Sequence, residues 1–269
     1  MKKTALLLLL LVSAAYGYAL KPDRNYINTP DKLGISYKEH DVVTSDKYSI
    51  KVWQCFPSSD NDKKTTLVVA YGDAGNMSYW LEQTRELVSK GFTVVLFDYR
   101  GFGKSSDFEM DYDYLYYNEF AIDLATVVNW AQNNMKDNKT GIWALSMGTI
   151  MTTIALERVK PDFIIAEGYV VSPVVVQQKL KELKKKNVLL PKEVDKYEPN
   201  LKKIQVPILL FAGKQDVITT ADDSKMVEEI NPLNKLVLFD GNHLQGFKVL
   251  SGSGYGDKYI GAIFDFIKH

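Results

Sequence analysis

The chain has 269 residues, which is long for an average domain but common for a single α/β domain. Hydrophobic residues make up 46% of it and charged residues 25%, so the sequence can build a large core and bulk disorder is excluded. Basic and acidic residues balance at 33 each, which removes the charge excess expected of a nucleic-acid-binding protein. We therefore expect a small-molecule acyl substrate as the partner and no nucleic acid.

Residues 1–19 are predicted to be a secretory signal peptide. Two of the first three residues are lysines, an apolar run follows over Ala5–Ala14, and small residues stand at Gly17 and Ala19. The apolar run is shorter than the roughly 20 residues that a spanning helix needs, so a permanent anchor is the weaker alternative. We expect cleavage after Gly17 or Ala19 and an exported product, either in the periplasm, in the cell envelope or secreted.

From residue 20 onward, strand-like and helical patterns alternate, which indicates a mainly parallel sheet flanked by helices. Residues 33–56 contain two strands that we expect to pair as an antiparallel hairpin. Further strands are predicted at 65–71, 92–97, 141–145, 163–171, 206–212 and 236–239, and helices at 78–90, around 120–131 and at 259–267. Residues 20–269 are therefore expected to form one α/β domain with a central sheet of about eight strands.

Residues 174–200 interrupt this alternation and are predicted to form a short helical cap inserted between two strands. The segment Leu180–Lys186 is rich in lysine. We interpret it as a solvated helix face, because Glu182 and Glu193 dilute the positive charge; a peripheral contact with a membrane surface or lipid is the alternative.

Ser146 is the candidate nucleophile. In Trp143–Ile150 a buried strand ends at a serine flanked by small residues and a helix begins at once, which is the pattern of a nucleophile elbow. Such an elbow lifts the serine hydroxyl above the edge of the sheet, and small neighbours let strand and helix pass closely. Ala144 stands here in place of the usual first glycine, so one methyl group has to be accommodated.

A serine hydroxyl needs a base within hydrogen-bond reach, and His243 is the candidate. The chain has three histidines. His40 precedes the core strands and His269 is the last residue, whereas His243 lies in a polar loop after the last predicted strand. Elimination therefore favours His243.

Asp216 is the candidate acid that orients this histidine. It follows a buried strand and a glycine turn, and Asp240 is the alternative because it lies close to His243 in sequence. Loops after parallel strands open at the same edge of a sheet, so Ser146, Asp216 and His243 can converge there. We prefer Asp216 because the order serine, acid, histidine is that of α/β hydrolases.

Two further segments extend this likeness. Ala70–Asn76 resembles the oxyanion loop of small serine hydrolases, and Phe97–Ser106 resembles their Asp-Tyr-Arg-Gly-x-Gly-x-Ser loop. Nearly everything after the predicted leader thus resembles the α/β-hydrolase superfamily, in its small-cap branch of esterases, lipases and peptidases. The resemblance implies an oxyanion hole formed by the backbone N–H groups of Asp73 and Met147. The chain departs from the family at Tyr71, where histidine is usual, and at Asp73, where asparagine is common.

The resemblance implies a serine hydrolase that cleaves a carboxylic ester through an acyl-enzyme, with no cofactor and no metal. Thioester cleavage, as in removal of lipid acyl groups from proteins, and peptide cleavage are alternatives that keep the same three residues. A binding protein that uses the same fold without catalysis is an alternative of another class, because fold alone does not decide function.

Overall fold

The computed structural model of the protein describes residues 17–268. The predicted signal peptide therefore lies outside the described residues except for its last three, and so does His269. Within residues 17–268 no helix is both long and apolar enough to cross a membrane.

The core of the molecule is one twisted sheet. In the described part of the chain it has eight strands, in the order β10-β9-β8-β7-β4-β6-β3-β2. The strands are β2 (Ser36–Val43), β3 (Ser49–Phe56), β4 (Thr65–Ala70), β6 (Thr93–Phe97), β7 (Lys139–Leu145), β8 (Phe163–Glu167), β9 (Ile208–Gly213) and β10 (Lys235–Phe239). Strand β3 runs antiparallel to both β2 and β6, and the other pairs are parallel. The predicted fold class, a mainly parallel sheet of about eight strands, is confirmed.

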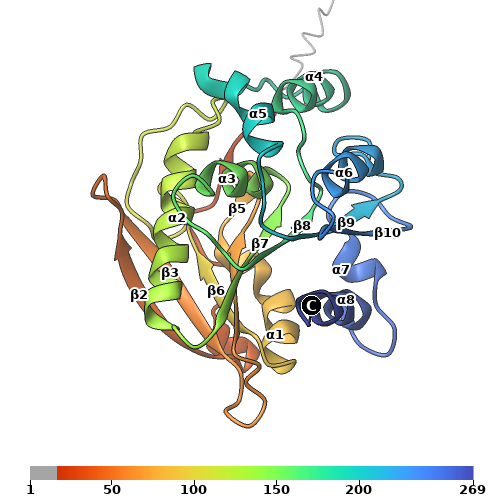
Figure 1. The fold of residues 1–269 in the computed structure, drawn as a ribbon. Coiled ribbons are helices and arrows are strands. Elements are labelled where there is room, and N and C mark those ends of the chain that lie inside the picture. The colour runs from red at the N-terminus through yellow and green to blue at the C-terminus, as the bar shows by residue number, and fades with distance from the viewer. Residues whose placement is uncertain (1–16, 269) are drawn as a thin grey trace, which may run out of the picture.

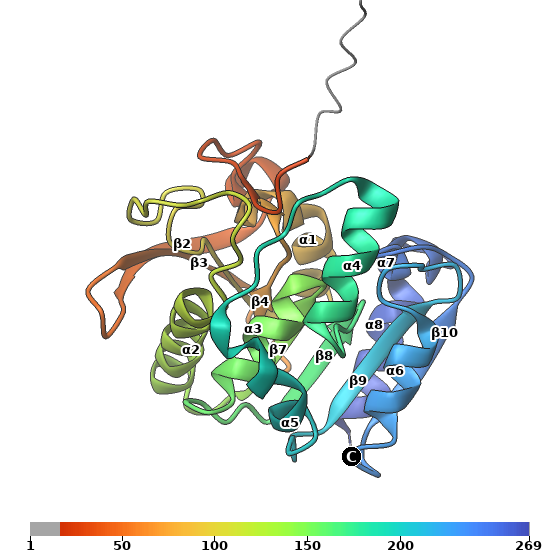
Figure 2. The ribbon, with the colours of Figure 1, turned by 90° about the horizontal axis from the view of Figure 1, so that it is seen from above.

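Helices cover both faces of this sheet (Figures 1 and 2). One face carries α1 and α8 with the short α7, and the other carries α2, α3 and α6. Their bounds are α1 (Leu81–Ser89), α2 (Tyr117–Asn134), α3 (Met147–Ala155), α6 (Ala221–Glu228), α7 (Gly246–Val249) and α8 (Asp257–Ile267). Because helices lie on both faces, the central strands need apolar side chains on both sides, and every residue of β4, β6 and β9 is buried.

The exposed edge of the sheet is protected by charge. The edge strand β2 presents Lys38, Glu39 and Asp41 to solvent. Lys51 of the neighbouring strand forms ion pairs with both acidic residues, at 3.1 Å to Glu39 and 2.8 Å to Asp41. Charged side chains on an edge strand discourage pairing with a second chain.

Two of the differences between predicted and observed bounds have a clear structural cause. The strand predicted at 163–171 ends at Glu167, because Gly168 has a φ of +65° and turns the chain away from the sheet. The helix predicted from residue 78 is preceded by a 3₁₀ turn, η2 (Met77–Trp80), and only then continues as α1.

The chain between β8 and β9 folds into three helical pieces, and the first of them lies at the carboxyl ends of the strands. These are α4 (Pro173–Lys184), η3 (Lys192–Lys196) and α5 (Tyr197–Leu201), and we call residues 173–201 the cap. Ser172 caps the N-terminus of α4 by accepting a hydrogen bond from Val175 N. A two-residue strand, β1 (Lys21–Pro22), pairs with β5 (Ala74–Gly75) at the same end of the molecule.

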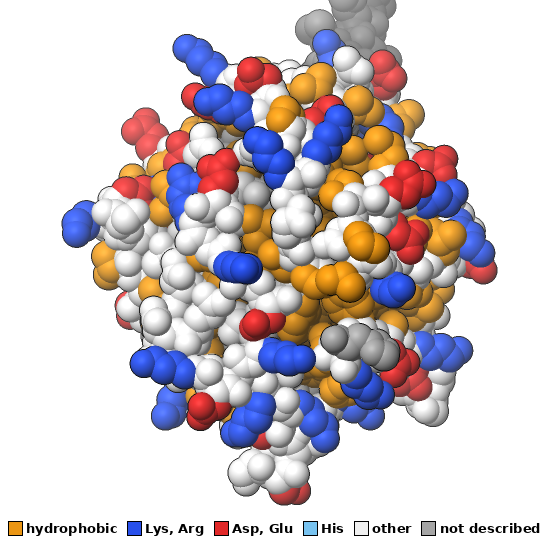
Figure 3. Space-filling view, viewed as in Figure 1, with side chains coloured by type: hydrophobic (Ala, Val, Ile, Leu, Met, Phe, Trp, Pro, Cys, Tyr) orange, Lys and Arg blue, Asp and Glu red, His pale blue; other side chains and the backbone are white. Residues whose placement is uncertain are grey.

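Basic and acidic side chains are interspersed on the face of the molecule that Figure 3 shows, with apolar side chains gathered near its middle. The even mixture agrees with the balanced charge of the sequence.

Candidate active site

Ser146 occupies a strained turn between β7 and α3. Its φ of 54° and ψ of −119° lie outside the conformations that residues other than glycine usually adopt. Its backbone N–H donates to Glu167 O at 2.9 Å, which ties the turn to β8. A Cβ atom at Gly148 would lie 1.9 Å from Ala70 O, so only glycine lets α3 start this close to β4.

The methyl group of Ala144 fits because its neighbours across the sheet are equally small. Ala144 pairs with Ala70 on β4 and with Ala166 on β8, and all three side chains are fully buried. The departure from glycine at this position therefore needs no shift of the adjacent strands.

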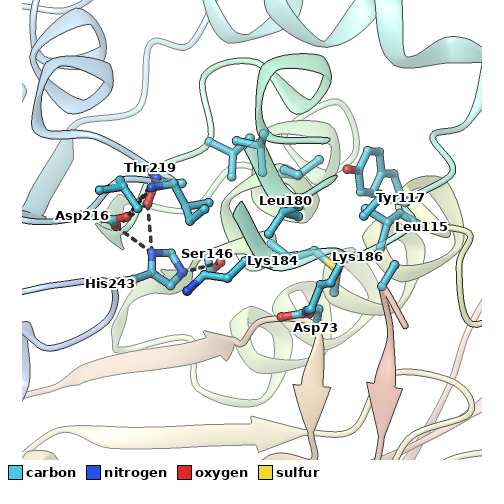
Figure 4. Close-up of a pocket in the computed structure, with 18 of the residues that line it drawn as sticks. Asp73, Leu115, Tyr117, Ser146, Leu180, Lys184, Lys186, Asp216, Thr219 and His243 are labelled. Atoms are coloured by element: carbon cyan, nitrogen blue, oxygen red, sulfur yellow. Dashed lines mark hydrogen bonds and ion pairs between the residues drawn. The ribbon is translucent and has the colours of Figure 1, made fainter. Parts of the chain in front are cut away.

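The three predicted side chains meet at the carboxyl edge of the sheet (Figure 4). His243 Nε2 lies 2.9 Å from Ser146 Oγ, and His243 Nδ1 lies 2.7 Å from Asp216 Oδ2. Since a carboxylate only accepts hydrogen bonds, this arrangement places the ring proton on Nδ1 and leaves Nε2 free to accept from the serine. The alternative acid, Asp240, instead forms an exposed ion pair with Lys214 at 3.0 Å.

Asp216 is buried and fully engaged. Its Oδ1 accepts the N–H groups of Ile218, at 2.9 Å, and Thr219, at 3.1 Å. Burial alone would raise the pKa of Asp216, but the contacts with His243 and with the Thr219 hydroxyl hold that pKa below its ordinary value. The group therefore remains an anion that can orient the histidine.

Thr219 is a member of the site that the sequence did not reveal. Its hydroxyl donates to Asp216 Oδ2 at 2.7 Å and lies 3.0 Å from His243 Nδ1. The usable signal was the spacing, since a threonine three residues after an aspartate commonly bonds back to that carboxylate in a turn.

The other two histidines lie elsewhere. His40 is on β2 and contacts Gln54 Oε1 at 3.1 Å, and His269 lies outside the described residues. Within residues 17–268, no group of three or more His, Cys, Asp or Glu side chains is arranged to hold a metal ion.

A pocket of about 390 Å³ opens beside Ser146 and His243. Its wall is mostly apolar, and the cap contributes one side of it. The lining includes Leu115, Tyr117, Met147, Ile150, Val170, Val176, Leu180, Val188 and Ile218. The sequence between residues 108 and 117 is rich in aromatic residues; Tyr117 lines this pocket, whereas Phe108, Tyr114 and Tyr116 pack on one another.

The two predicted oxyanion donors, Asp73 and Met147, both border this pocket. Neither backbone N–H has an acceptor among the hydrogen bonds of the described chain. A Cβ atom on Gly72 would lie 3.6 Å from the Cβ of Ser146, so the loop passes directly beside the serine. Both N–H groups are therefore available to a ligand next to the Ser146 hydroxyl.

Tyr71, at the first departure from the family pattern, points away from the pocket. Its ring is fully buried against Phe97, Tyr99 and Phe102, with ring centroids 5.0–6.4 Å apart. The residue thus belongs to the core beneath the oxyanion loop, and its aromatic contacts fix the start of that loop.

The segment after β6 braces the same loop from below. The buried carboxylate of Asp98 accepts hydrogen bonds from Met77 N at 2.9 Å, Lys104 N at 3.0 Å and the Tyr26 hydroxyl at 2.7 Å. Arg100 does not pair with Asp98; it is held by other carboxylates farther from the pocket. The two charges of the Asp-Tyr-Arg motif therefore support different parts of the structure.

Glu167 connects the nucleophile turn with the histidine loop. Its backbone carbonyl accepts Ser146 N, and its buried carboxylate accepts Gly246 N at 2.6 Å, three residues after His243. Burial raises the pKa of Glu167 to about 7, against the lowering effect of the Gly246 N–H and the Tyr259 hydroxyl. A charged residue at the end of a buried strand was the signal for this role.

Glu167 gives a prediction for stability. A carboxyl whose pKa rises from 4.5 to about 7 on folding stabilises the protein below pH 4.5, and this contribution is lost as the pH rises to about 7. We expect Glu167→Gln to remove that titration. The free energy of unfolding of the variant minus that of wild type should therefore increase by about 3 kcal/mol from pH 4.5 to pH 8. Urea denaturation at several pH values measures this difference. The exposed Asp240→Asn is the control, and parallel wild-type and Glu167→Gln curves would contradict the prediction.

Comparison with known proteins agrees with this architecture. Residues 65–166 match the family model described as the alpha/beta hydrolase fold. The chain is 26% identical over 207 residues to the uncharacterized protein YfhR of Escherichia coli, which covers 75% of this chain and 69% of that one. It is 30% identical over 83 residues to the uncharacterized membrane protein YNL320W of Saccharomyces cerevisiae, a match that spans 28% of that relative.

Among solved structures, the esterase Pf2001 of Pyrococcus furiosus superposes with a TM-score of 0.73 at 20% identity, covering 94% of this chain and 98% of that one. Topology, family match and superposition together identify the class of structure: the protein has the α/β-hydrolase fold.

Proposed function

We propose that this protein is an exported serine hydrolase that cleaves a carboxylic ester through an acyl-enzyme. The observation that carries the proposal is the continuous contact from Ser146 Oγ to His243 Nε2 and from His243 Nδ1 to Asp216 Oδ2, at 2.9 and 2.7 Å. Export rests on the sequence of residues 1–19.

In the proposed reaction His243 Nε2 takes the proton of Ser146 as its oxygen attacks the substrate carbonyl. The backbone N–H groups of Asp73 and Met147 stabilise the negative oxygen of the tetrahedral intermediate. The protonated His243 then donates to the leaving alcohol, and a water molecule attacks the acyl-enzyme in a second, equivalent step. Asp216 remains ionised and stabilises the imidazolium throughout.

The pocket supports an apolar acyl group as the part of the substrate that is held. Its volume of about 390 Å³ and its aliphatic wall suit a short or medium acyl chain, which transfer of apolar surface from water would stabilise. Thioester and peptide cleavage are the alternatives, because the same three residues serve all of these bond types and the fold alone does not decide between them.

A fluorophosphonate probe tests the proposed nucleophile. We expect the wild-type protein to be labelled at Ser146, no labelling of Ser146→Ala, and slow labelling of His243→Ala, because the base is lost while the hydroxyl remains. Peptide mapping by mass spectrometry identifies the labelled residue. Equal labelling of wild type and Ser146→Ala would refute the assignment.

The type of bond is tested separately with esters, thioesters and aminoacyl amides that share one acyl group. We expect the highest kcat/KM for the ester. A labelled protein that turns over only thioesters or amides would assign one of the alternative activities. A protein that is neither labelled nor active on any of these substrates would favour a binding role for the fold.

A further inference from the structure

The second departure from the family pattern, Asp73, places a carboxylate at the oxyanion loop. Asp73 borders the pocket beside Ser146, and its side chain is one-third exposed. An uncompensated negative charge at this position would repel the negative oxygen that forms during acyl transfer.

A lysine of the cap neutralises this charge. Lys186 Nζ lies 2.8 Å from Asp73 Oδ2, and the lysine side chain is four-fifths buried. Figure 4 shows the two side chains meeting at the edge of the pocket, on the opposite side of Ser146 from Asp216. A second lysine of the cap, Lys184, also lines the pocket, but no ion pair joins it to Asp73 within residues 17–268.

The backbone directs Lys186 to this position. Helix α4 ends at Lys184, and Lys185 adopts a left-handed conformation with φ of 52°, which turns the chain back over the pocket. Lys186 N then donates to Leu180 O at 3.2 Å. The lysine is therefore held by the end of its own helix, by a contact that does not involve the predicted signal peptide.

The backbone of Asp73 is held independently of its side chain. Asp73 O accepts Lys21 N at 2.9 Å, and β1 pairs with β5 immediately after it. The loop thus has a backbone attachment that survives loss of the ion pair, so the charge and the position of Asp73 can be separated experimentally.

We propose that Lys186 is a positioning residue of the active site, whose cation compensates Asp73 and makes the Asp73 N–H usable as an oxyanion donor. The inference rests on the proposed function. It makes the cap part of the catalytic apparatus, because the cap supplies the positive charge that the oxyanion loop lacks.

The test is a double-mutant cycle of Lys186→Met and Asp73→Asn, read out as kcat and KM for an acyl ester and as the rate of fluorophosphonate labelling. We expect Lys186→Met to lower kcat by about tenfold or more with little change in KM, because the repulsion arises in the transition state. In the Asp73→Asn background the same substitution should cause no further loss. Lys186→Arg should retain most of the activity, and Lys181→Met, at an exposed position of α4 away from the pocket, is the matched control.

Two further measurements separate charge from packing. The loss in Lys186→Met should shrink at 1 M salt, because screening weakens the repulsion, and thermal denaturation should show that each variant is folded. Equal losses in both Asp73 backgrounds, or no loss in Lys186→Met, would overturn the inference while leaving the proposed function intact. Absence of labelling and of turnover in the wild-type protein would instead refute the proposed function, and with it this inference.

Discussion

Ser146→Ala is expected to lower kcat for ester hydrolysis by about 10⁴- to 10⁶-fold, with KM nearly unchanged. In the proposed reaction the substitution removes the attacking oxygen, whereas the apolar pocket beside it keeps its shape. Residual catalysis would come from the oxyanion donors and from binding alone. Steady-state kinetics of the purified protein measure the effect, with Ser59→Ala, an exposed serine in a loop, as the control.

The same assignment predicts non-additivity. His243→Ala should cost about as much as Ser146→Ala, and the double variant should be no slower than either, because the two residues act as one unit. Multiplicative losses in the double variant would show that the two residues act independently and would contradict a shared proton transfer.

Arg100→Met is expected to lower the free energy of unfolding by about 3–5 kcal/mol, the largest effect on stability that we predict. The Arg100 side chain is 1% exposed; it bonds Asp123 Oδ1 at 2.7 Å and Asp46 Oδ2 at 2.6 Å. Its guanidinium also stacks on the Tyr48 ring at 4.1 Å. Without the arginine, the fully buried carboxylate of Asp123 would have no positive charge beside it.

The loss of stability in Arg100→Met should depend on pH, because it depends on whether Asp123 is charged. Burial raises the pKa of Asp123 to about 6 although Arg100 lowers it, so removal of Arg100 raises that pKa further. The variant should therefore lose more stability at pH 8 than at pH 5, where the carboxyl can be neutral. Urea denaturation measures this, and Arg100→Met/Asp123→Asn should recover part of the loss. The exposed Arg85→Met should change stability by about 0.5 kcal/mol or less, and an equally small change in Arg100→Met would refute the prediction.

The sheet could be predicted because the hydrophobicity of each strand indicates how deeply that strand is buried. Strands β4, β6 and β9 are buried throughout and largely apolar, as is typical of strands covered by helices on both faces. The end of β8 was predicted four residues too late, because Phe163–Val171 remains largely apolar where the chain leaves the sheet. Hydrophobicity reports burial, and the residues after Glu167 are buried without being a strand.

The candidate site residues Ser146, His243 and Asp216 could also be predicted from the sequence, because each follows a recognisable strand and the chain has few histidines. Their convergence follows from parallel topology, in which loops after the strands share one edge. Two other members of the site had weaker local signals, namely the spacing of Thr219 from Asp216 and the charge of Glu167 at the end of a buried strand, and Lys186 had none. The contacts of all three depend on how loops fold back over the sheet edge, which local sequence does not encode.

The sequence by itself determined the fold class, the candidate nucleophile with its base and acid, and the two departures at Tyr71 and Asp73, since these depend on residue type and order along the chain. Only the tertiary structure decided what the departures mean. The Tyr71 ring packs inside an aromatic core. Asp73 forms an ion pair with Lys186 of the cap, which lies 113 positions later in the sequence. The physical reason is that the effect of a charge depends on what lies within a few ångströms of it, and that distance is set by folding.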